Sequence, residues 1–517
     1  MTDMRGAWIF AVLACGAGCD SSQPFTVPAG DWAVEETALT EPNVRVLSAV
    51  SRGGGGHYAY TRRTPGGMQA VVDGRPGREY ARVDARVVLS PDGNRFAYRA
   101  WRGKDSNLIF VVDGREGPEF QSGGAEWTYE DRVTFSPDGR RFFYLGWVES
   151  GDEQGWCLVL DGNAAGVYGD IRSPSFSPDG NHFGYTALDD GCSPVIDGRR
   201  LHSEEWAAYS GYDSRFVSSV VMGVGGRYAA EVCLRDKDGN LSDRRGMVVD
   251  GRLQKWRCSA GFGWPAFSPD GNHLAFASCA ENGEYMILDG RAGPEHAAVT
   301  DCAFSPDSRH LAYAAYDGNR WFVVLDGRPH PAHDQVCWPY SIGQTRDFWP
   351  AGESEVDASP FSDYSGDKLV FSPDSRHLAY AARDGNESYV VRDGKAGASF
   401  GREILYGSIV FSPDSRHLAH VAWTRDERKC LLVDDRVVCE LGSEGWYALN
   451  KPLFSRDSRH IACVKGTGDK ECVVLDGREG PLFDCIVPDG PAFAPDGSLQ
   501  YIGLRGRMLY RVRHVPK

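Results

Sequence analysis

The feature that most limits what this chain can fold into is a short motif that recurs along almost its whole length. FSPDSRHLAYAA occurs intact at Phe304 and again at Phe371. Self-similarity at a regular spacing is the mark of a repeat architecture, in which each repeat is one supersecondary unit. Worn copies near Gly55 and Gly225 bring the expected number of repeats to eleven. Nine copies are legible, and the other seven begin at Leu89, Phe135, Phe176, Phe267, Phe411, Phe454 and Phe493.

A second element of the form VVLDGRxGP alternates with the first. The steps from Asp270 to Asp289, then to Asp307 and to Asp326, are 19, 18 and 19 residues, so one unit has about 40 residues in two hairpin-sized halves. Pro-Asp-Gly and Asp-Gly favour tight turns, and the segments between them have the alternation of strands. Four antiparallel strands in about 40 residues are typical of a propeller blade. The Asp-Gly element lies at Asp73, Asp113, Asp161, Asp197, Asp250, Asp289, Asp326, Asp393 and Asp476, with Asp434-Asp435 as a variant.

These repeats predict an all-β protein, a β-propeller of about eleven four-stranded blades. The 62 glycines and 28 prolines agree with many tight turns. Because eleven blades exceed the usual number in a ring, we expect two rings, with one large ring as the alternative. The C-terminal segment from Phe493 supplies three strands, and DWAVEETAL near Trp32 supplies a fourth. We therefore expect the two ends of the chain to pair within one blade.

The motif FSPDG followed by an aliphatic-Ala-aromatic strand resembles the WD-repeat-like propeller repeat of the TolB type. The resemblance covers nearly all of the chain after about Asp31. It is specific for the fold but implies little about function, because relatives of this repeat serve as partner-binding platforms, as substrate-gating domains of peptidases and in bacterial envelope proteins. The chain departs from that family in having too many repeats for one TolB-type ring and no separate N-terminal domain of the TolB kind.

The spacing of the repeats predicts how the chain is divided. Asp326 to Asp374 spans 48 residues, where 18 to 25 is the rule. We expect about seven blades in residues 31–331, an irregular aromatic and acidic insert or decayed blade in residues 332–368, and about four to five blades in residues 369–517. Residues 1–19 are interpreted as a signal peptide and residues 20–30 as a linker.

The first residues indicate export to the cell envelope. Arg5 precedes an apolar run that is too short to span a bilayer, and small residues follow as far as Cys19. The Gly-Ala-Gly-Cys end resembles the lipobox of bacterial lipoproteins, which implies that Cys19 is acylated. Cys15 is a competing site, and an ordinary cleaved signal or a cytosolic chain are the alternatives. The expected location is lipid-anchored or periplasmic, with the membrane contacted only through the anchor.

Four cysteines near the C-terminus form two pairs of equal spacing. With a two-residue turn midway, Cys430 would lie opposite Cys439, and Cys463 opposite Cys472. Residues that face each other at non-hydrogen-bonded positions of a hairpin are close enough for a disulfide. The alternative is that all four are small apolar residues on strand faces.

The repeats leave little room for a catalytic domain, and no nucleophile elbow, zinc-protease motif, phosphate-binding loop or cysteine knuckle occurs. We expect no cofactor and no metal, and the sequence favours a non-enzymatic role without deciding it. A residue repeated at one strand position makes the same local contact in every blade, so six histidines are interpreted as structural: His182, His273, His310, His377, His417 and His460. Six turn aspartates are expected to bond their own turns: Asp138, Asp179, Asp270, Asp307, Asp374 and Asp414.

The insert is the expected binding region, because insertions in repeat folds project from one face. Aromatic anchors in a polar surround are typical of binding hot spots. The alternative is a loop that plugs a junction between rings. The insert combines acidic residues with six aromatic ones, Trp338, Tyr340, Phe348, Trp349, Phe361 and Tyr364.

The predicted function is that of a non-enzymatic binding or scaffold protein of the bacterial cell envelope, whose propeller faces contact a protein or a glycan. The alternative is an enzyme, a hydrolase or a lyase, with a site in a propeller channel. The formal charge of -15 and the lack of a lysine- or arginine-rich stripe argue against nucleic acid as a partner. The oligomeric state is left open.

Overall fold

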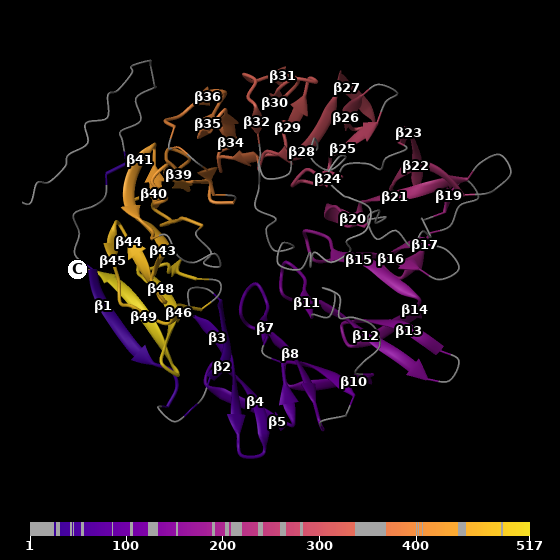
Figure 1. Cartoon of the computed structure of the whole chain (residues 1–517). Helices are drawn as coiled ribbons and strands as arrows, with labels where there is room; N and C mark the ends of the chain where they lie inside the picture. The colour runs from indigo at the N-terminus through magenta and orange to yellow at the C-terminus, as the bar shows by residue number, and fades with distance from the viewer. Residues whose placement is uncertain are drawn as a thin grey trace, which may run out of the picture.

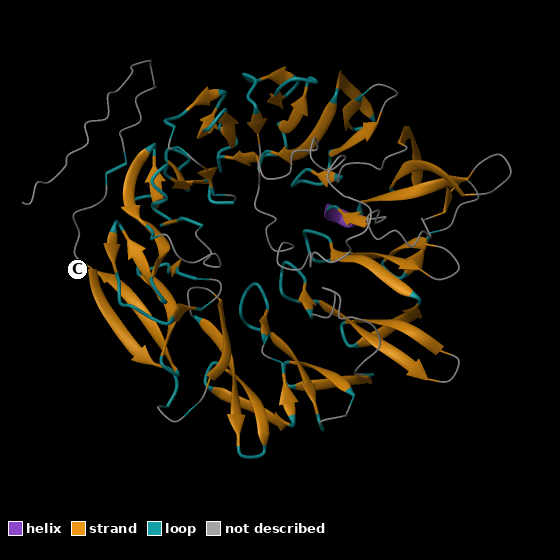
Figure 2. Cartoon of the chain, in the orientation of Figure 1, coloured by secondary structure: helices purple, strands orange, loops and turns teal. Residues whose placement is uncertain are grey.

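A computed structural model gives the structure of the protein. Strands make up nearly all of its regular structure (Figure 2), and the only helical element among the described residues is a 3-10 turn, η1 (Val224–Gly226). No helix in that part of the chain has the length and the apolar character needed to cross a membrane. The structure describes residues 25–26, 32–41, 44, 46–52, 56–84, 86–103, 107–121, 133–150, 153–188, 192–201, 206–207, 220–235, 241–258, 265–279, 283–336, 369–399, 401, 403–405, 407–442, 451–487 and 490–517.

Eleven four-stranded antiparallel blades stand around a common axis in one ring (Figure 1). The all-β propeller and the number of blades are therefore confirmed. The ring is the single large one that the sequence left as an alternative, and the preference for two rings is wrong. The reason is that eleven buried hydrophobic clusters fill the eleven interfaces between successive blades, including the interface between the last blade and the first.

Within each blade the strands follow one another outward from the axis, and we name them A to D in that order. The first six blades are β2 (Val46–Arg52), β3 (His57–Thr64), β4 (Gly67–Val72), β5 (Arg75–Tyr80); β6 (Arg82–Val83) with β7 (Val88–Leu89), β8 (Phe96–Trp101), β9 (Leu108–Val112), β10 (Arg115–Phe120); β11 (Thr134–Phe135), β12 (Phe142–Ser150), β13 (Glu153–Leu160), β14 (Asn163–Tyr168); β15 (Asp170–Phe176), β16 (Phe183–Leu188), β17 (Cys192–Ile196), β18 (Arg199–Arg200); β19 (Trp206–Ala207) with β20 (Val220–Met222), β21 (Tyr228–Arg235), β22 (Leu241–Val249), β23 (Arg252–Cys258); and β24 (Ala266–Phe267), β25 (Leu274–Cys279), β26 (Glu284–Leu288), β27 (Arg291–His296).

The remaining five blades complete the ring in the same way. They are β28 (Ala298–Phe304), β29 (Leu311–Tyr316), β30 (Trp321–Leu325), β31 (Arg328–Pro329); β32 (Gln335–Val336) with β33 (Leu369–Phe371), β34 (Leu378–Asp384), β35 (Glu387–Arg392), β36 (Lys395–Ala396); β37 (Glu403–Ile404) with β38 (Val410–Phe411), β39 (Leu418–Trp423), β40 (Lys429–Val433), β41 (Arg436–Glu440); β42 (Leu453–Phe454), β43 (Ile461–Thr467), β44 (Lys470–Leu475), β45 (Arg478–Glu479); and β46 (Cys485–Ile486) with β47 (Ala492–Phe493), β48 (Leu499–Arg505), β49 (Met508–Pro516) and β1 (Trp32–Ala38).

The alternation of the repeat strand explains how one blade packs against two neighbours. In β29, Ala312 and Ala314 belong to the cluster shared with blade 8. Leu311, Tyr313 and Ala315, at the intervening positions, belong to the cluster shared with blade 6. Side chains of a strand point alternately to the two faces of its sheet, so small residues on one face and larger ones on the other fit blades that stand side by side.

The ring closes where the two ends of the chain meet. β1 pairs antiparallel with β49 from Trp32 opposite Pro516 to Ala38 opposite Tyr510, and the two strands lie side by side at the left of Figure 1. Beyond β1, the N–H of Leu39 bonds the carbonyl of Leu509 at 2.8 Å. The predicted completion of the last blade by the N-terminal strand is therefore confirmed.

The connections of this topology divide between two faces. The turns from strand A to strand B and from strand C to strand D lie on one face, which we call the turn face. The connections from strand B to strand C and from each blade to the next lie on the other, which we call the loop face. The FSPD and Asp-Gly elements are all on the turn face, so the repeat sequence builds one face of the ring.

Candidate binding site at the loop face

The repeated histidines and the Asp-Gly turns form one recurring contact on the turn face. In blade 7, His310 Nδ1 lies 2.6 Å from Asp326 Oδ2, and the N–H of Leu311 donates to Asp326 Oδ1 at 3.0 Å. One aspartate thus ties the A–B turn to the C–D turn of its own blade. The structural interpretation of the six histidines is confirmed, because each has such a partner: Asp197, Asp289, Asp326, Asp393, Asp434 and Asp476.

Four blades hold the same contact with residues that the histidine pattern did not show. His57 bonds Asp73 in blade 1, whose repeat is worn. Arg95, Arg141 and Arg227 replace histidine in blades 2, 3 and 5, and each Nε donates to its Asp-Gly aspartate. The closing blade has no such pair, because its C–D turn is the break between the two ends of the chain.

The turn aspartates hold their own turns, as predicted. In blade 8, Ser372 Oγ donates to Asp374 Oδ1 at 2.6 Å, and the N–H of Arg376 donates to the same oxygen at 3.1 Å. Burial acts to raise the pKa of Asp374, but these hydrogen bonds outweigh it and lower the pKa below its usual range. The turn-face carboxylates are therefore committed to the fold.

The loop face is where the blades differ from one another. Among the described residues, strand A is interrupted at one level in seven blades, by as little as a bulge between Thr300 and Ala303 in blade 7. The interruption has five residues between Ile404 and Val410 in blade 9, whose partners on β39 are three residues apart. In blade 8, Val336 and Val370 pair with Ala382 and Ala379, also three residues apart, but 33 residues lie between them.

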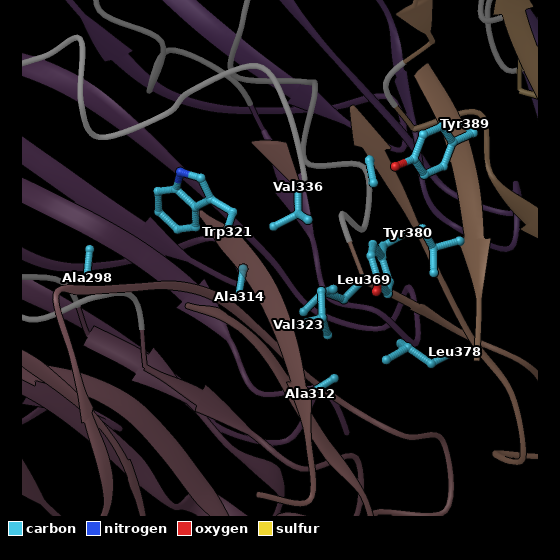
Figure 3. Packing of buried hydrophobic residues seen from close by; sticks show 12 residues of the cluster. Ala298, Ala312, Ala314, Trp321, Val323, Val336, Leu369, Leu378, Tyr380 and Tyr389 are labelled. Atoms are coloured by element: carbon cyan, nitrogen blue, oxygen red, sulfur yellow. The ribbon is translucent and has the colours of Figure 1, made fainter. Parts of the chain in front are cut away.

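The period-breaking segment therefore leaves and rejoins a single strand of blade 8. Both of its described ends are packed, since Val336 and Leu369 belong to the cluster between blades 7 and 8, together with Trp321 and Tyr380 (Figure 3). The inter-blade bond on the turn face is also kept, because the N–H of Asp307 donates to Ser375 Oγ at 3.0 Å. Strand A of blade 8 is thus paired with β34 on both sides of the interruption, and the described residues at both of its ends pack in the blade 7–8 interface.

A polar cluster lies where this segment starts. His333 Nδ1 lies 3.0 Å from Asp384 Oδ2 and 2.8 Å from the Tyr389 hydroxyl, and Arg320 contacts Asp384 Oδ1. The N–H of Asp334 donates to Asp384 Oδ1 at 3.0 Å. Burial acts to raise the pKa of Asp384, but hydrogen bonds from His333 and Tyr389 outweigh it and lower the pKa to about 2. The ionised carboxylate of Asp384 thus binds residues on both sides of the crossing from blade 7 to blade 8 and holds the chain there.

The predicted binding residues lie outside the described residues. This holds for the six aromatic residues of the insert and for Cys19, so the structure places only the two ends of the insert. Within the described ranges no group of three or more histidine, cysteine or acidic side chains is arranged to hold a metal ion.

Both predicted cysteine pairings are wrong in register. Cys439 lies opposite Leu431, because a bulge between Leu431 and Leu432 shifts the outer part of that hairpin by one residue. Cys463 lies opposite Val474 and Cys472 opposite Lys465, since the turn is centred one residue later than predicted. The structure accordingly has four free thiols at these positions.

The turn face also gathers basic residues that the linear sequence does not show as a stripe. Most blades carry an exposed arginine or lysine directly after the Asp-Gly turn, at the start of strand D, and several carry an exposed arginine in the A–B turn. Positions about 40 residues apart in the sequence thus meet in one ring on the structure. The exposed basic residues are Arg75, Arg115, Arg199, Arg252, Arg291, Arg328, Lys395, Arg436 and Arg478 beside strand D, and Arg140, Arg309, Arg376, Arg416, Arg456 and Arg459 in the A–B turns.

The fold defines the chain as a β-propeller protein, and one stretch of it matches a WD-repeat model. Residues 291–319 match the family described as WD domain, G-beta repeat. The matched stretch begins with β27, the outer strand of blade 6, and runs through β28 and β29 of blade 7. None of the curated proteins matches the sequence.

Several solved structures are similar to this chain at low sequence identity. A crystal structure of the eukaryotic initiation factor is 11% identical, with a TM-score of 0.37, over 76% of this chain and 93% of that one. Hydrazine synthase of Kuenenia stuttgartiensis is 13% identical, with a TM-score of 0.24, over 56% and 98%. The β-propeller domain of the Trilobed protease from Pyrococcus furiosus, described as having an open velcro topology, is 11% identical, with a TM-score of 0.24, over 55% and 94%. At these values the likeness carries no functional information.

Proposed function

We propose that this chain is a non-enzymatic binding or scaffold protein of the cell envelope. In this proposal it is exported, anchored through acylated Cys19, and contacts a protein or a glycan with its loop face. The segment between Val336 and Val370 is the principal contact. The β-propeller fold and the WD-repeat match support a binding role, since propellers present large faces on a rigid ring.

The observation that carries this proposal is that the segment is surplus to the ring. Blade 9 makes the same strand-A connection with five residues, from Leu405 to Ile409, where blade 8 has 33. The described residues on both sides of the segment, Val336 and Leu369, pack in the blade 7–8 interface, and the turn-face bond between these blades is kept. Residues that the fold does not need are available for binding, and six of these are aromatic.

The enzymatic alternative has less support from the described residues. Among the described residues outside the repeat motifs, the cluster of His333, Asp384 and Tyr389 has the side chains that most resemble a catalytic site. Both oxygens of Asp384 already accept hydrogen bonds, and the side chains of His333 and Tyr389 are buried. These contacts tie the Nδ1 of His333 to Asp384 and Tyr389, which accounts for the cluster as a structural one.

Replacing the segment by the short connection of blade 9 tests the proposal. The variant carries Leu-Tyr-Gly-Ser-Ile between Val336 and Val370, and a second variant keeps the segment but changes Trp338, Trp349 and Phe361 to serine. Each is compared with the unaltered protein by co-purification from the native host. We expect both variants to fold, with unchanged circular dichroism, and to lose the same partners. Unchanged partners with an intact fold would refute the binding role of the segment.

A further inference from the structure

Two aromatic side chains near the described start of the chain pack on the turn face, each at an interface between blades. The Phe25 ring lies edge-on against the repeat histidine His417 of blade 9, with ring centroids 5.2 Å apart, and against Phe454 of blade 10 at 5.9 Å. Trp32 packs in the same way on His460 of blade 10, at 4.9 Å. Phe25 and Trp32 thus occupy successive interfaces, 9–10 and 10–11, and are seven residues apart in the sequence.

Each of these rings lies among the same three repeat positions, and we call such a set a notch. A notch consists of the last residue before the Asp-Gly turn, the repeat histidine of the same blade, and the phenylalanine of the FSPD element in the next blade. Phe25 and Trp32 pack against the hydrophobic clusters at their two interfaces. The filled notches are Val433, His417 and Phe454 between blades 9 and 10, and Leu475, His460 and Phe493 between blades 10 and 11.

Two further notches of the same composition are open among the described residues. Their histidine side chains are 45% and 41% exposed, whereas those of the filled notches are 13% and 21% exposed. Leu288 is exposed, but Leu475 at the same position of blade 10 is fully buried. The open notches are Leu288, His273 and Phe304 between blades 6 and 7, and Leu325, His310 and Phe371 between blades 7 and 8.

At four other interfaces an arginine of the chain lies over the FSPD phenylalanine. In blade 8, Arg392 stands at the position before the Asp-Gly turn, and its guanidinium lies 5.4 Å from the centre of the Phe411 ring. In the part of the chain that the structure describes, Phe304 and Phe371 are the two FSPD phenylalanines with neither an arginine nor an N-terminal aromatic ring on them. The other three arginine contacts are Arg95 with Phe135, Arg141 with Phe176, and Arg227 with Phe267.

We propose that the open notches bind an extended segment of a partner protein that carries two aromatic side chains seven residues apart. The N-terminal segment of the chain is the pattern for this binding, with one ring in each of two successive notches, edge-on to the imidazole. Because that segment passes from blade 9 to blade 10, the first aromatic side chain of the partner enters the 6–7 notch and the second enters the 7–8 notch. Aromatic side chains bury a large apolar area and are typical anchors of such contacts.

The occupant has to come from another protein. Trp32 pairs with Pro516 as the first residue of β1, so ring closure holds the chain's own segment at the filled notches. A second copy of the chain uses its segment in the same way. The open notches are on the opposite face from the segment between Val336 and Val370, so this site does not depend on the function proposed for the loop face.

Peptide binding to the full chain tests the site. The probe is a fluorescently labelled synthetic peptide that copies residues 23–34, QPFTVPAGDWAV, and so has both aromatic side chains at the observed spacing. We expect saturable binding, measured by fluorescence anisotropy. A peptide with Phe25→Ser and Trp32→Ser should bind at least about tenfold more weakly, because the burial of two rings is lost. If the unchanged peptide does not bind, the proposal is refuted.

Variants that cover the open notches provide the matched comparison. Leu288→Arg and Leu325→Arg together give blades 6 and 7 the residue that blade 8 has at this position, Arg392. We expect this variant to fold, with unchanged circular dichroism, and to bind the peptide at least about tenfold more weakly. Val437→Arg, at an exposed position of β41 outside both notches, should bind it as the unaltered chain does. Equal affinity of the double variant and the unaltered chain would overturn the assignment.

Photo-cross-linking locates the peptide independently of these variants. With benzoylphenylalanine at its first aromatic position the peptide should attach beside Leu288, and at its second position beside Leu325. Attachment beside Val433 or Leu475 would show that the peptide only displaces the chain's own segment, which contradicts the proposal. Sedimentation of the chain alone distinguishes a partner from a second copy. We expect a monomer, and self-association that the double arginine variant abolishes would assign the notches to a second copy instead.

Discussion

Arg505 donates to both carboxylate oxygens of Glu36, from Nη1 to Oε2 at 2.9 Å and from Nη2 to Oε1 at 3.3 Å, and so joins residues that are 469 positions apart. The pair lies across β48, β49 and β1 of the closing blade. The Arg505 guanidinium also lies 4.4 Å from the centre of the Phe483 ring, which belongs to the cluster between blades 10 and 11. Closure therefore combines a strand pairing, a two-point ion pair and a packed aromatic ring.

Removal of β1 should destabilise the whole ring. A chain that starts at Leu39 loses seven paired positions along β49 and leaves that strand as an open edge. We expect the free energy of unfolding to fall by several kcal/mol, and the chain to aggregate through the exposed edge of β49. A chain that starts at Phe25 keeps β1 and should match the full protein. Equal thermal midpoints for the two truncated chains, measured by calorimetry, would contradict this account of closure.

The serines that follow the turn aspartates should give a larger free energy of unfolding than alanine or glycine at the same position. Ser375 has a positive φ of 63°, and its Oγ accepts the N–H of Asp307 in the previous blade. Ser375→Ala loses this buried bond and keeps the unfavourable backbone conformation, so we expect a cost of about 2 kcal/mol. Ser375→Gly loses the bond but relieves the backbone, and should cost about 1 kcal/mol less. Chemical denaturation measures both, and an alanine variant as stable as the glycine variant would count against the argument.

Stability should fall between neutral and mildly acidic pH because of His514. This histidine is buried in β49, where its Nε2 lies 3.2 Å from the Tyr501 hydroxyl. Burial lowers the pKa of His514 from 6.5 to about 4. The unfolded chain then binds a proton between about pH 6.5 and pH 4 that the folded chain does not, so stability is lost as the pH falls through that window.

His514 alone should make the free energy of unfolding about 2 kcal/mol smaller at about pH 5 than at about pH 7.5. Urea denaturation at the two pH values measures the loss. His514→Gln removes the titrating group, so the variant should be less stable at neutral pH but should lose less between the two values. A variant with the same pH dependence as the unaltered protein would show that other groups are responsible.

The four cysteines of blades 9 and 10 should be found reduced. Burial raises the pKa of Cys463 and of Cys439 to about 12 and that of Cys472 to about 11, so little thiolate is present at neutral pH. We expect these thiols to react with an alkylating reagent only after denaturation, and peptide mapping to show each one modified. Recovery of a Cys430–Cys439 or Cys463–Cys472 disulfide from the native protein would contradict the register.

The sequence predicted the parts of the fold that depend on local chemistry. FSPD and Asp-Gly turns are set by residues that lie next to one another, so the blades, their number and the roles of His310 and Asp307 could be inferred from short segments. The three strands from Phe493 and the single strand near Trp32 also predicted the closing blade, which agrees with pairing of Trp32 and Pro516.

The number of rings and the strand registers depend on contacts between segments, which a linear pattern does not show. Whether eleven blades close on one axis depends on how side chains such as Ala312 and Leu378 fill each interface. A single bulge beside Leu431 moved Cys439 to the other side of its hairpin. The arginines of the C–D turns come together only in the folded ring, because residues such as Arg291 and Arg328 are separated by a blade's length in the sequence.

The pairing of β1 with β49 also has a consequence for synthesis. β1 is synthesised before every other strand of the ring, and its partner strand, which begins at Met508, is synthesised after them. The contact with the greatest sequence separation in the ring is therefore the last to form, and β1 must stay unpaired while ten blades assemble. The charges of Glu35 and Glu36 reduce the tendency of this unpaired strand to pair with other strands before β49 is made. The strand that closes the ring is thus also the one that stays unpaired longest and most needs protection from pairing with the wrong strand.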